Sequence, residues 1–68
     1  MTYTFPERLK ELRTEKKLST RELATAVGCS HIAISRWERN VKKPNVDNLI
    51  ALCKFFNVSA DYLLGLED

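Results

Sequence analysis

Apolar side chains recur at helical spacing along this chain, in five short segments that polar and charged residues separate. In the first segment, Leu9 and Leu12 lie three residues apart, and most residues around them are charged. Such spacing places apolar side chains on one side of an α-helix, and no run of strict alternation predicts a strand. The pattern therefore predicts an all-α chain, with helices at residues 6–17, 20–27, 31–39, 46–56 and 60–64.

Residues that favour helix ends stand between these segments. Pro6 fits an opening turn, because its missing N–H has no helical partner there. Ser19 and Glu22 predict a capping box, in which each side chain accepts a hydrogen bond from the backbone N–H of the other residue. The other starts carry serine or asparagine caps, and the ends carry residues that tolerate a left-handed backbone. These residues are Ser30, Asn45 and Ser59 at the starts, and Gly28, Asn40, Asn57 and Gly65 at the ends.

The segment 20–39 has the spacing of a helix-turn-helix. Two helices that cross near a short turn need a small side chain at their contact, which Ala24 supplies. The turn needs a residue that accepts positive φ, which Gly28 supplies. Ile34 and Trp37 lie three residues apart and predict the buried side of the second helix of the motif. The opposite side is then free to enter a DNA groove.

The fourth segment predicts a helix that packs along one side. Leu49, Ile50, Cys53 and Phe56 fall at positions i, i+1, i+4 and i+7, which we interpret as a core-facing stripe. With 68 residues, the chain has room for one domain and not for a second. We therefore predict a single compact five-helix domain over residues 1–68.

Charge is unevenly distributed along the chain. Residues 1–43 carry ten lysines and arginines against five glutamates, a net charge of +5. Residues 44–68 carry one lysine against four acidic residues, a net charge of −3. A basic front fits a domain that presents one side to a polyanion, but an ordinary solvated surface gives the same counts. Charge alone does not decide between them.

The outward side of the predicted third helix carries the candidate base-reading residues His31, Ile32, Ser35 and Arg36. The Arg36 guanidinium can donate two hydrogen bonds to O6 and N7 of guanine. His31 can donate to or accept from a base edge, Ile32 can contact a thymine methyl group, and Ser35 can reach DNA through water. The alternatives are a surface ion pair for Arg36 and simple exposure to solvent for His31 and Ile32.

Helix starts and the loop after the third helix supply candidate phosphate contacts. Backbone N–H groups at a helix start lie at its positive end and bind anions. Cations beyond the third helix can neutralise phosphates, although plain solvation is the alternative for the lysines. The candidates are Thr20, Arg21, Ser30, Arg39, Asn40, Lys42 and Lys43.

Arg13 and Glu38 are assigned a structural role. Both fall at inner edges of their predicted helices, so an ion pair between them would fix the first helix against the third. Such a pair need not add net stability, but loss of one partner costs about 3–5 kcal/mol when the pair is buried. Trp37 is expected in the core rather than stacked on a base, because of its spacing from Ile34.

Nothing in the sequence points to a metal, a cofactor or a small-molecule ligand. Cys29 and Cys53, with His31 near only one of them, lack the spacing of a zinc site. Cys53 is most simply a core residue, whereas Cys29 precedes a helix start that could favour its thiolate, which leaves a redox role open. No apolar run approaches the roughly 20 residues of a membrane span, and no secretory signal is visible. We expect a cytoplasmic protein, where a disulfide is not favoured.

Short strings along most of the chain are specific in combination, although none is specific alone. They are Arg8-Leu9-Lys10-Glu11-Leu12-Arg13, Leu18-Ser19, Glu22-Leu23-Ala24, Val27-Gly28, Ile34-Ser35-Arg36-Trp37-Glu38, Lys43-Pro44, Leu49, Phe56, Val58-Ser59 and Asp61-Tyr62-Leu63-Leu64-Gly65. Through them the chain resembles the phage-repressor-like, XRE-type helix-turn-helix regulators from about Arg8 to Gly65. The resemblance implies a five-helix domain whose third helix reads the major groove, as a homodimer on a roughly palindromic operator.

The resemblance also supports the Arg13–Glu38 pair, which in relatives links the first helix to the end of the recognition helix. Two positions depart from the family pattern. Relatives commonly have glutamine where this chain has Thr20, which shortens the side chain that would reach DNA. They favour glycine at the position of Asn40, so the exit from the third helix is either strained or gains a polar contact. Both departures leave the operator sequence open.

We therefore expect a sequence-specific DNA-binding transcriptional regulator, most simply a repressor. The apolar residues near the end of the chain exceed what one small core holds and predict a dimer surface. A protein-interaction module, such as an antitoxin or adaptor domain, is the alternative, and it would bind DNA weakly with little salt dependence. An enzyme is not expected, since no nucleophile or paired carboxylates are arranged for catalysis. The residues of the predicted dimer surface are Phe55, Tyr62, Leu64 and Leu66.

Overall fold

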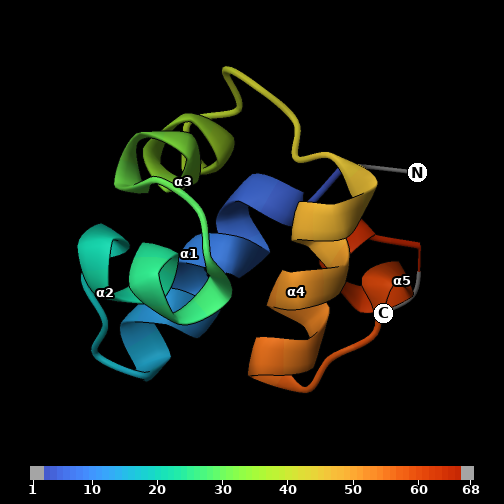
Figure 1. The fold of residues 1–68 in the computed structure, drawn as a ribbon. Helices are drawn as coiled ribbons and strands as arrows, with labels where there is room; N and C mark the ends of the chain where they lie inside the picture. Colours follow the sequence, from blue (N-terminus) through green and yellow to red (C-terminus); the bar gives the residue numbers. More distant parts are fainter. Residues whose placement is uncertain (1–2, 67–68) are drawn as a thin grey trace.

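The computed structural model describes residues 3–66, and these residues form five α-helices joined by short loops (Figure 1). No helix in this range is both long and apolar enough to cross a membrane. Every predicted helix is present, with ends that differ from the predicted ones by two residues at most, so the all-α prediction is confirmed. The helices are α1 (Phe5–Glu15), α2 (Thr20–Val27), α3 (His31–Glu38), α4 (Val46–Phe56) and α5 (Ala60–Leu64).

The helix starts are capped as the sequence predicts. At α2, the Ser19 hydroxyl accepts from the Glu22 N–H at 3.0 Å, and the Glu22 carboxylate accepts from the Ser19 N–H at 2.8 Å. The other caps use one side chain each, with distances of 2.8–3.1 Å to the N–H three residues on. Each cap satisfies a backbone donor that has no partner within the helix. These caps are Ser30 at α3, Asn45 at α4 and Ser59 at α5.

The predicted helix ends adopt the left-handed backbone. Gly28 follows α2 with φ +78°, and an added Cβ there would meet no atom within 4 Å. Backbone conformation alone therefore favours glycine at this turn. Gly65 ends α5 in the same way, while Asn40 and Asn57 take φ values of +58° and +56° after α3 and α4.

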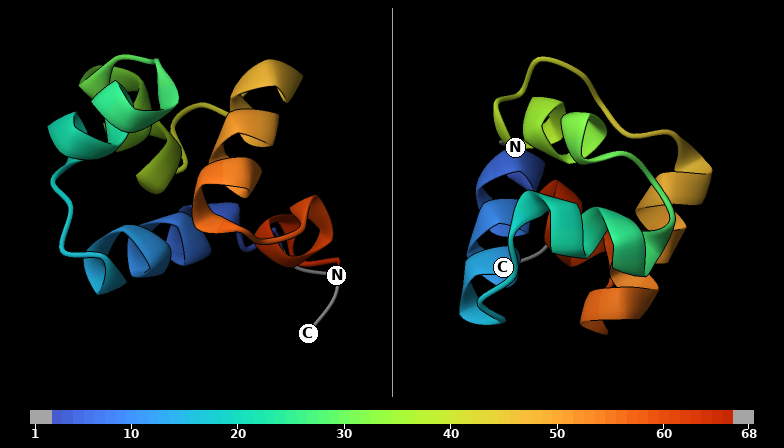
Figure 2. Two further views of the ribbon diagram at one scale, coloured as in Figure 1. Left: turned by 60° about the horizontal axis from the view of Figure 1, so that its bottom comes forward. Right: turned by 60° about the vertical axis from the view of Figure 1, so that its left-hand side comes forward.

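The core lies where the five helices converge. α3 packs on α1 and α2, while α4 packs on α2 and α5 (Figure 2). Burying their inner sides is the main stabilising contribution in so small a domain. The buried apolar residues come from all five helices and are Phe5, Leu9, Leu23, Ala24, Ile34, Trp37, Leu52, Phe56 and Leu63.

One core assignment was wrong. Ile50, expected on the inner stripe of α4, is 47% exposed, whereas Leu52 is fully buried. Successive residues turn by about 100° around a helix axis, so Ile50 lies well away from the line through Leu49 and Phe56. Leu52, three residues after Leu49, lies on the same side of the helix as Leu49 and Phe56. The inner side of α4 therefore follows an i, i+3, i+4, i+7 pattern that includes Leu52 and Cys53.

Candidate nucleic-acid interface

The inner side of α3 is fixed in the core. Ile34 is fully buried and Trp37 is 3% exposed. The Trp37 ring meets Phe5 of α1 edge-on, with 6.4 Å between ring centroids. The turn before α3 is held by α2, since the N–H groups of Gly28 and Cys29 both donate to the Ala24 carbonyl. These contacts fix the helix so that its outer side faces solvent.

An ion pair holds the far end of α3. The Arg13 guanidinium donates to both carboxylate oxygens of Glu38, from Nε at 2.6 Å and from Nη2 at 2.9 Å. Its Nη1 donates to the Leu18 carbonyl at 2.8 Å. Both side chains are largely buried. The hydrogen bond to Glu38 raises the pKa of Arg13, and this effect is larger than the opposing effect of desolvation, which lowers it. One side chain of α1 thus links the α1–α2 loop to α3.

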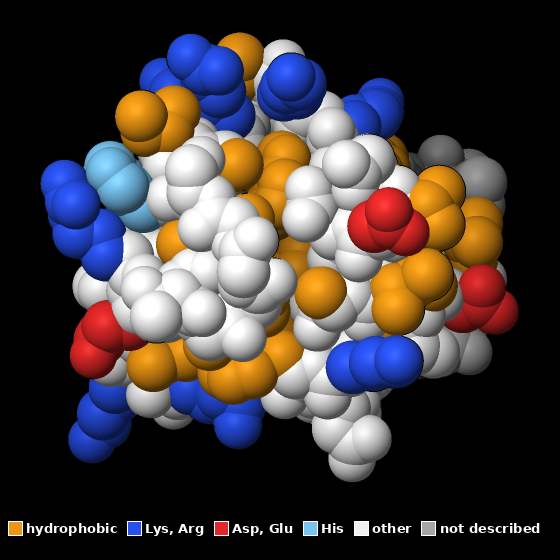
Figure 3. All heavy atoms as spheres, in the orientation of Figure 1, with side chains coloured by type: hydrophobic (Ala, Val, Ile, Leu, Met, Phe, Trp, Pro, Cys, Tyr) orange, Lys and Arg blue, Asp and Glu red, His pale blue; other side chains and the backbone are white. Residues whose placement is uncertain are grey.

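The four candidate base readers lie on the outer side of α3 or at its edge. Ile32 is 51% exposed and Arg36 is exposed, while His31 and Ser35 are half-buried. In Figure 3, lysine and arginine side chains gather over α3 and the loop that follows it, with the histidine beside them. Acidic side chains in this view lie mainly on the α4 side. The outer side of α3 therefore carries an exposed apolar residue, and basic side chains gather over the same helix and the loop after it.

The candidate phosphate contacts lie around this surface. Thr20 begins α2 and is half-buried, whereas the other six are exposed. The Ser30 hydroxyl already accepts from the Ala33 N–H at 3.1 Å, which leaves its O–H free to donate outward. Lys43 differs from the rest, because its ammonium lies 4.6 Å from the centre of the Tyr3 ring. That contact directs Lys43 toward the N-terminal segment.

The loop after α3 is tied to the helix through Asn40. The Val41 N–H donates to the Arg36 carbonyl at 2.9 Å, and the Asn40 N–H donates to the Trp37 carbonyl at 3.1 Å. With Asn40 at positive φ, this is a Schellman end, for which glycine is the usual residue. Asn40 therefore adopts the left-handed conformation that glycine usually supplies at such an exit.

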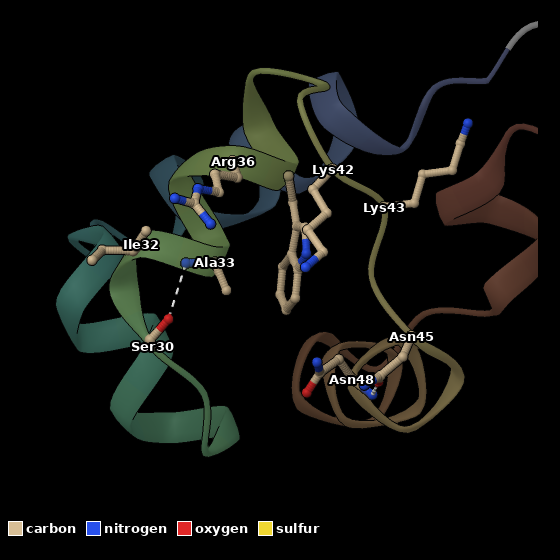
Figure 4. A pocket seen from close by; sticks show the side chains of 9 residues that line it. Ser30, Ile32, Ala33, Arg36, Lys42, Lys43, Asn45 and Asn48 are labelled. Carbon is tan, nitrogen blue, oxygen red and sulfur yellow. Dashed lines mark hydrogen bonds between the residues drawn. The ribbon is translucent and has the colours of Figure 1, made fainter.

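A pocket of about 460 Å³ separates α3 from the start of α4 (Figure 4). Arg36 and Lys42 line one side of it, and Asn45 and Asn48 of α4 line the other. Figure 4 shows Lys42 extending toward α4, while the ammonium of Lys43 points away from the pocket. The sequence pattern marks Asn45 only as a cap and gives no sign that the start of α4 faces α3.

The two cysteine thiols are half-buried, and burial raises the pKa of both Cys29 and Cys53. Burial therefore favours the neutral thiol at Cys29, opposite to the thiolate that the helix start was expected to favour. Cys53 packs against the core as predicted. Among the described residues, no three His, Cys, Asp or Glu side chains are grouped as metal ligands.

The residues of the expected dimer surface have unequal exposure. Leu66 and Phe55 are 50% and 36% exposed, while Tyr62 and Leu64 are half-buried. Tyr62 is covered by Arg8, whose guanidinium lies 4.2 Å from the ring centre and donates to the Tyr62 carbonyl. Leu64 packs on the core.

A helix-turn-helix family model matches residues 9–63, which is most of the chain and includes the whole α2–turn–α3 unit. The chain belongs to the helix-turn-helix family. The relatives of this chain that carry such a domain are named as regulators of transcription. The resemblance noted from the short sequence strings is confirmed.

The named relatives of this helix-turn-helix chain include both a repressor and an activator of transcription. The repressor protein C2 of Salmonella phage P22 is 43% identical over 63 residues, which is 93% of this chain and 29% of that protein. The transcriptional activator BcrR of Enterococcus faecalis is 42% identical over 64 residues, which is 94% of this chain and 31% of that protein. The chain therefore spans about a third of the length of these relatives.

The fold is also that of a solved phage repressor. A crystal structure of the P22 c2 repressor in complex with a synthetic operator superposes with a TM-score of 0.89 and 41% identity. The match covers 97% of this chain and all of that one. The five-helix architecture of this helix-turn-helix chain is thus the one that the phage repressor uses in its operator complex.

Proposed function

We propose that this chain binds double-stranded DNA as a sequence-specific transcriptional repressor, with α3 placed in the major groove. The observation that supports this proposal most directly is that Arg36 and Ile32 are exposed on the outer side of α3. The inner side of the same helix is fixed in the core by Ile34 and Trp37. Arg36 reads guanine through two hydrogen bonds, and Ile32 contacts a thymine methyl group. His31 and Ser35, at the edges, contact bases directly or through water.

The phosphate contacts flank α3 on both sides. Thr20, Arg21 and the backbone at the start of α2 bind one stretch of the backbone, and Ser30 joins them at the start of α3. Beyond the other end of α3, Arg39, Asn40, Lys42 and Lys43 bind a second stretch. All but Thr20 are exposed, as such contacts require. The P22 c2 repressor, similar over nearly the whole chain, was crystallised with an operator.

Two copies bind together on a roughly palindromic operator, with their α3 helices in successive major grooves about 34 Å apart. Of the residues first assigned to the dimer surface, Phe55 and Leu66 are exposed enough to contribute strongly, and Tyr62 and Leu64 contribute less. Val46 and Ile50 are further exposed apolar residues of α4, on a different side of the helix from Phe55. Burying such residues against a second copy would remove them from water.

The α4 surface is self-complementary. Val46, Ile50 and Lys54 lie at i, i+4 and i+8, with Asp47 on the same side of the helix. If two α4 helices pack antiparallel about a twofold axis near Ile50, Asp47 of one copy lies opposite Lys54 of the other. This charge pattern supports a second copy as the partner of the surface.

The test is selection of bound sequences from a random duplex pool, first with the unaltered chain and then with Arg36→Ala. We expect a roughly palindromic consensus, and for Arg36→Ala a loss of preference at one base pair of each half-site, worth about 1–3 kcal/mol. Lys42→Ala is the matched control, since loss of a phosphate contact weakens all sequences alike. An unchanged consensus for Arg36→Ala would exclude its base-reading role.

The same assay separates this proposal from a protein-interaction module. Neutralisation of phosphates releases counterions, so the affinity of a DNA-binding domain falls steeply with salt. A chain that selects no consensus and whose weak binding hardly changes with salt would be a protein-binding domain of the antitoxin or adaptor type. The relatives of this chain among named proteins favour the regulator, because they include a repressor and an activator.

A further inference from the structure

The pocket between α3 and α4 is lined by hydrogen-bond donors and cations. Arg36 and Lys42 carry positive charge on its α3 side, and none of its lining residues is acidic. On the other side, Asn45 accepts from the Asn48 N–H at 2.8 Å, which leaves other first-turn N–H groups of α4 without helical partners. Asp47 is in this first turn, but it is exposed and does not line the pocket.

Trp37 also lines this pocket, and its indole nitrogen has no hydrogen-bond acceptor among the described residues. The residue is only 3% exposed. Within the same range, no fully buried side-chain nitrogen or oxygen lacks a partner, so the indole N–H retains access to solvent. A tryptophan this deeply buried normally pairs its N–H with an acceptor, so here the acceptor has to come from the solvent side, as water or as a ligand.

We propose that the Trp37 indole N–H donates a hydrogen bond to a phosphodiester oxygen of DNA seated in this pocket. Indole nitrogen is a donor only, so its partner must be an acceptor. The cations beside it and the start of α4 opposite select an anionic acceptor. The pocket adjoins the outer side of α3, where the proposed function places the major groove, so the DNA backbone beside that groove supplies the oxygen.

This inference rests on the proposed DNA binding and adds a contact that the sequence pattern did not indicate. Trp37 then serves two purposes at once. Its ring packs in the core against Phe5, and its nitrogen reaches the strand outside. A phosphate contact from a core residue has no flexible side chain to order on binding, unlike one from Lys42.

The chain contains one tryptophan, so its indole N–H gives a single nuclear magnetic resonance signal. We would follow that signal in the ¹⁵N-labelled full chain while adding a duplex selected from a random pool. A hydrogen bond to phosphate should move the proton downfield and slow its exchange with water by about tenfold or more. An unchanged indole signal, with the backbone signals of α3 shifting on binding, would overturn the proposal.

Inorganic phosphate at matched ionic strength distinguishes a free anion from a DNA strand. We expect it to leave the indole signal nearly unchanged, because it lacks the contacts that α3 and the loop make with a duplex. If inorganic phosphate produced the full shift, the pocket would be a site for free anions, and the assignment to a DNA strand would be wrong.

A chemical replacement isolates the N–H from the packing. Synthesis of the 68-residue chain with 3-benzothienylalanine at Trp37 keeps the ring shape and exchanges the N–H for sulfur. We expect affinity to fall about tenfold for the selected duplex and for an unrelated one, with the consensus unchanged. The melting temperature of the free chain reports whether the fold is retained.

The contact also has a DNA side. Methylphosphonates placed one at a time in the duplex remove the charge from single phosphates. At one position, the resulting loss of affinity should be smaller for the benzothienyl chain than for the natural one. Equal affinities for the two chains would overturn the Trp37 contact while leaving DNA binding intact. Absence of any selected consensus would instead remove the proposed function itself.

Discussion

α3 and α4 are both amphipathic helices with exposed apolar residues, yet the surroundings of those residues differ. On α3, Ile32 is 51% exposed, and lysine and arginine side chains gather over this helix and the loop after it, with the histidine beside them (Figure 3). On α4, Val46 and Ile50 are 70% and 47% exposed and share their side of the helix with Asp47. An apolar residue within a cationic surround fits a nucleic acid, whereas one beside an acidic residue fits a protein.

The helices also differ in how firmly they are held. α3 is fixed at one end by the turn at Gly28 and at the other by the Arg13–Glu38 pair. α4 depends on its inner apolar side, chiefly Leu52 and Phe56. A surface that reads bases must keep a fixed position, because a hydrogen bond tolerates only small displacements. A surface that packs apolar groups is less demanding, since the hydrophobic effect is non-directional.

The largest expected effect comes from releasing α3. Glu38→Ala leaves the largely buried Arg13 guanidinium without its carboxylate, and we expect unfolding free energy to fall by about 3 kcal/mol. Urea unfolding measures it. Lys54→Ala on α4 is the control at a protein concentration too low for self-association, where its exposed side chain should matter by less than about 0.5 kcal/mol. If both substitutions cost the same, α3 would not be held differently from α4.

Replacing both partners separates the ion pair from the space it fills. In a chain with Arg13→Met and Glu38→Leu, no charge is left buried, and most of the lost stability should return. Hydrogen exchange of the α3 amides would report the same recovery. A double variant as unstable as Glu38→Ala would indicate that the cost lies in packing.

The second effect separates the two exposed isoleucines. Ile32→Ser should weaken binding to the selected duplex by about fivefold, with self-association unchanged, because about half of an isoleucine side chain is worth about 1 kcal/mol. Ile50→Ser should weaken self-association by about tenfold or more, since both copies carry the change. Sedimentation and duplex titration measure the two quantities. An exchange of these outcomes would reverse the assignment of the two surfaces.

The third prediction concerns Asn40 and Asn57, the asparagines that follow α3 and α4. Asn40→Gly and Asn57→Gly both relieve a positive φ, and each should raise unfolding free energy by about 0.5 kcal/mol. Only Asn40→Gly removes a side chain from the proposed DNA surface, so only it should lower affinity. Thermal melts and duplex titrations of the pair test this. Equal affinities for both variants would remove Asn40 from the set of phosphate contacts.

The smallest effect concerns the cysteines, one before α3 and one on α4. Burial raises the pKa of both thiols, so each should react with iodoacetamide several-fold more slowly at pH 8 than in urea. The raised pKa adds stability below the ordinary thiol pKa of 9.0, and that contribution is lost as pH rises above it. Faster reaction at Cys29 than at Cys53 would restore a redox role for the turn.

Much of the fold could be predicted because helix ends are local. Ser19, Asn45 and Gly28 act through atoms a few residues away, so the sequence is enough to identify them. The Arg13–Glu38 contact was foreseen from helix periodicity and the family resemblance, and the structure places the two side chains in contact. Ile50 was misassigned because a position at the edge of a stripe depends on which neighbour covers it.

The site could be predicted only in part. Arg36 and Ile32 follow from the two residues that face inward, because helix periodicity then fixes the outward side. The pocket was missed because it forms between α3 and the start of α4, which the loop 39–45 brings together (Figure 4). Trp37 was assigned wholly to the core, since periodicity reports where a ring points but not where one of its atoms emerges.

The three contacts of the Arg13 guanidinium have a consequence for how the domain opens. Because one side chain joins α1, the Leu18 carbonyl and Glu38, α3 cannot separate without also breaking the link to α1. Slowly exchanging amides in both helices should therefore report one shared opening free energy. α3 would then lose its order only when the whole molecule unfolds.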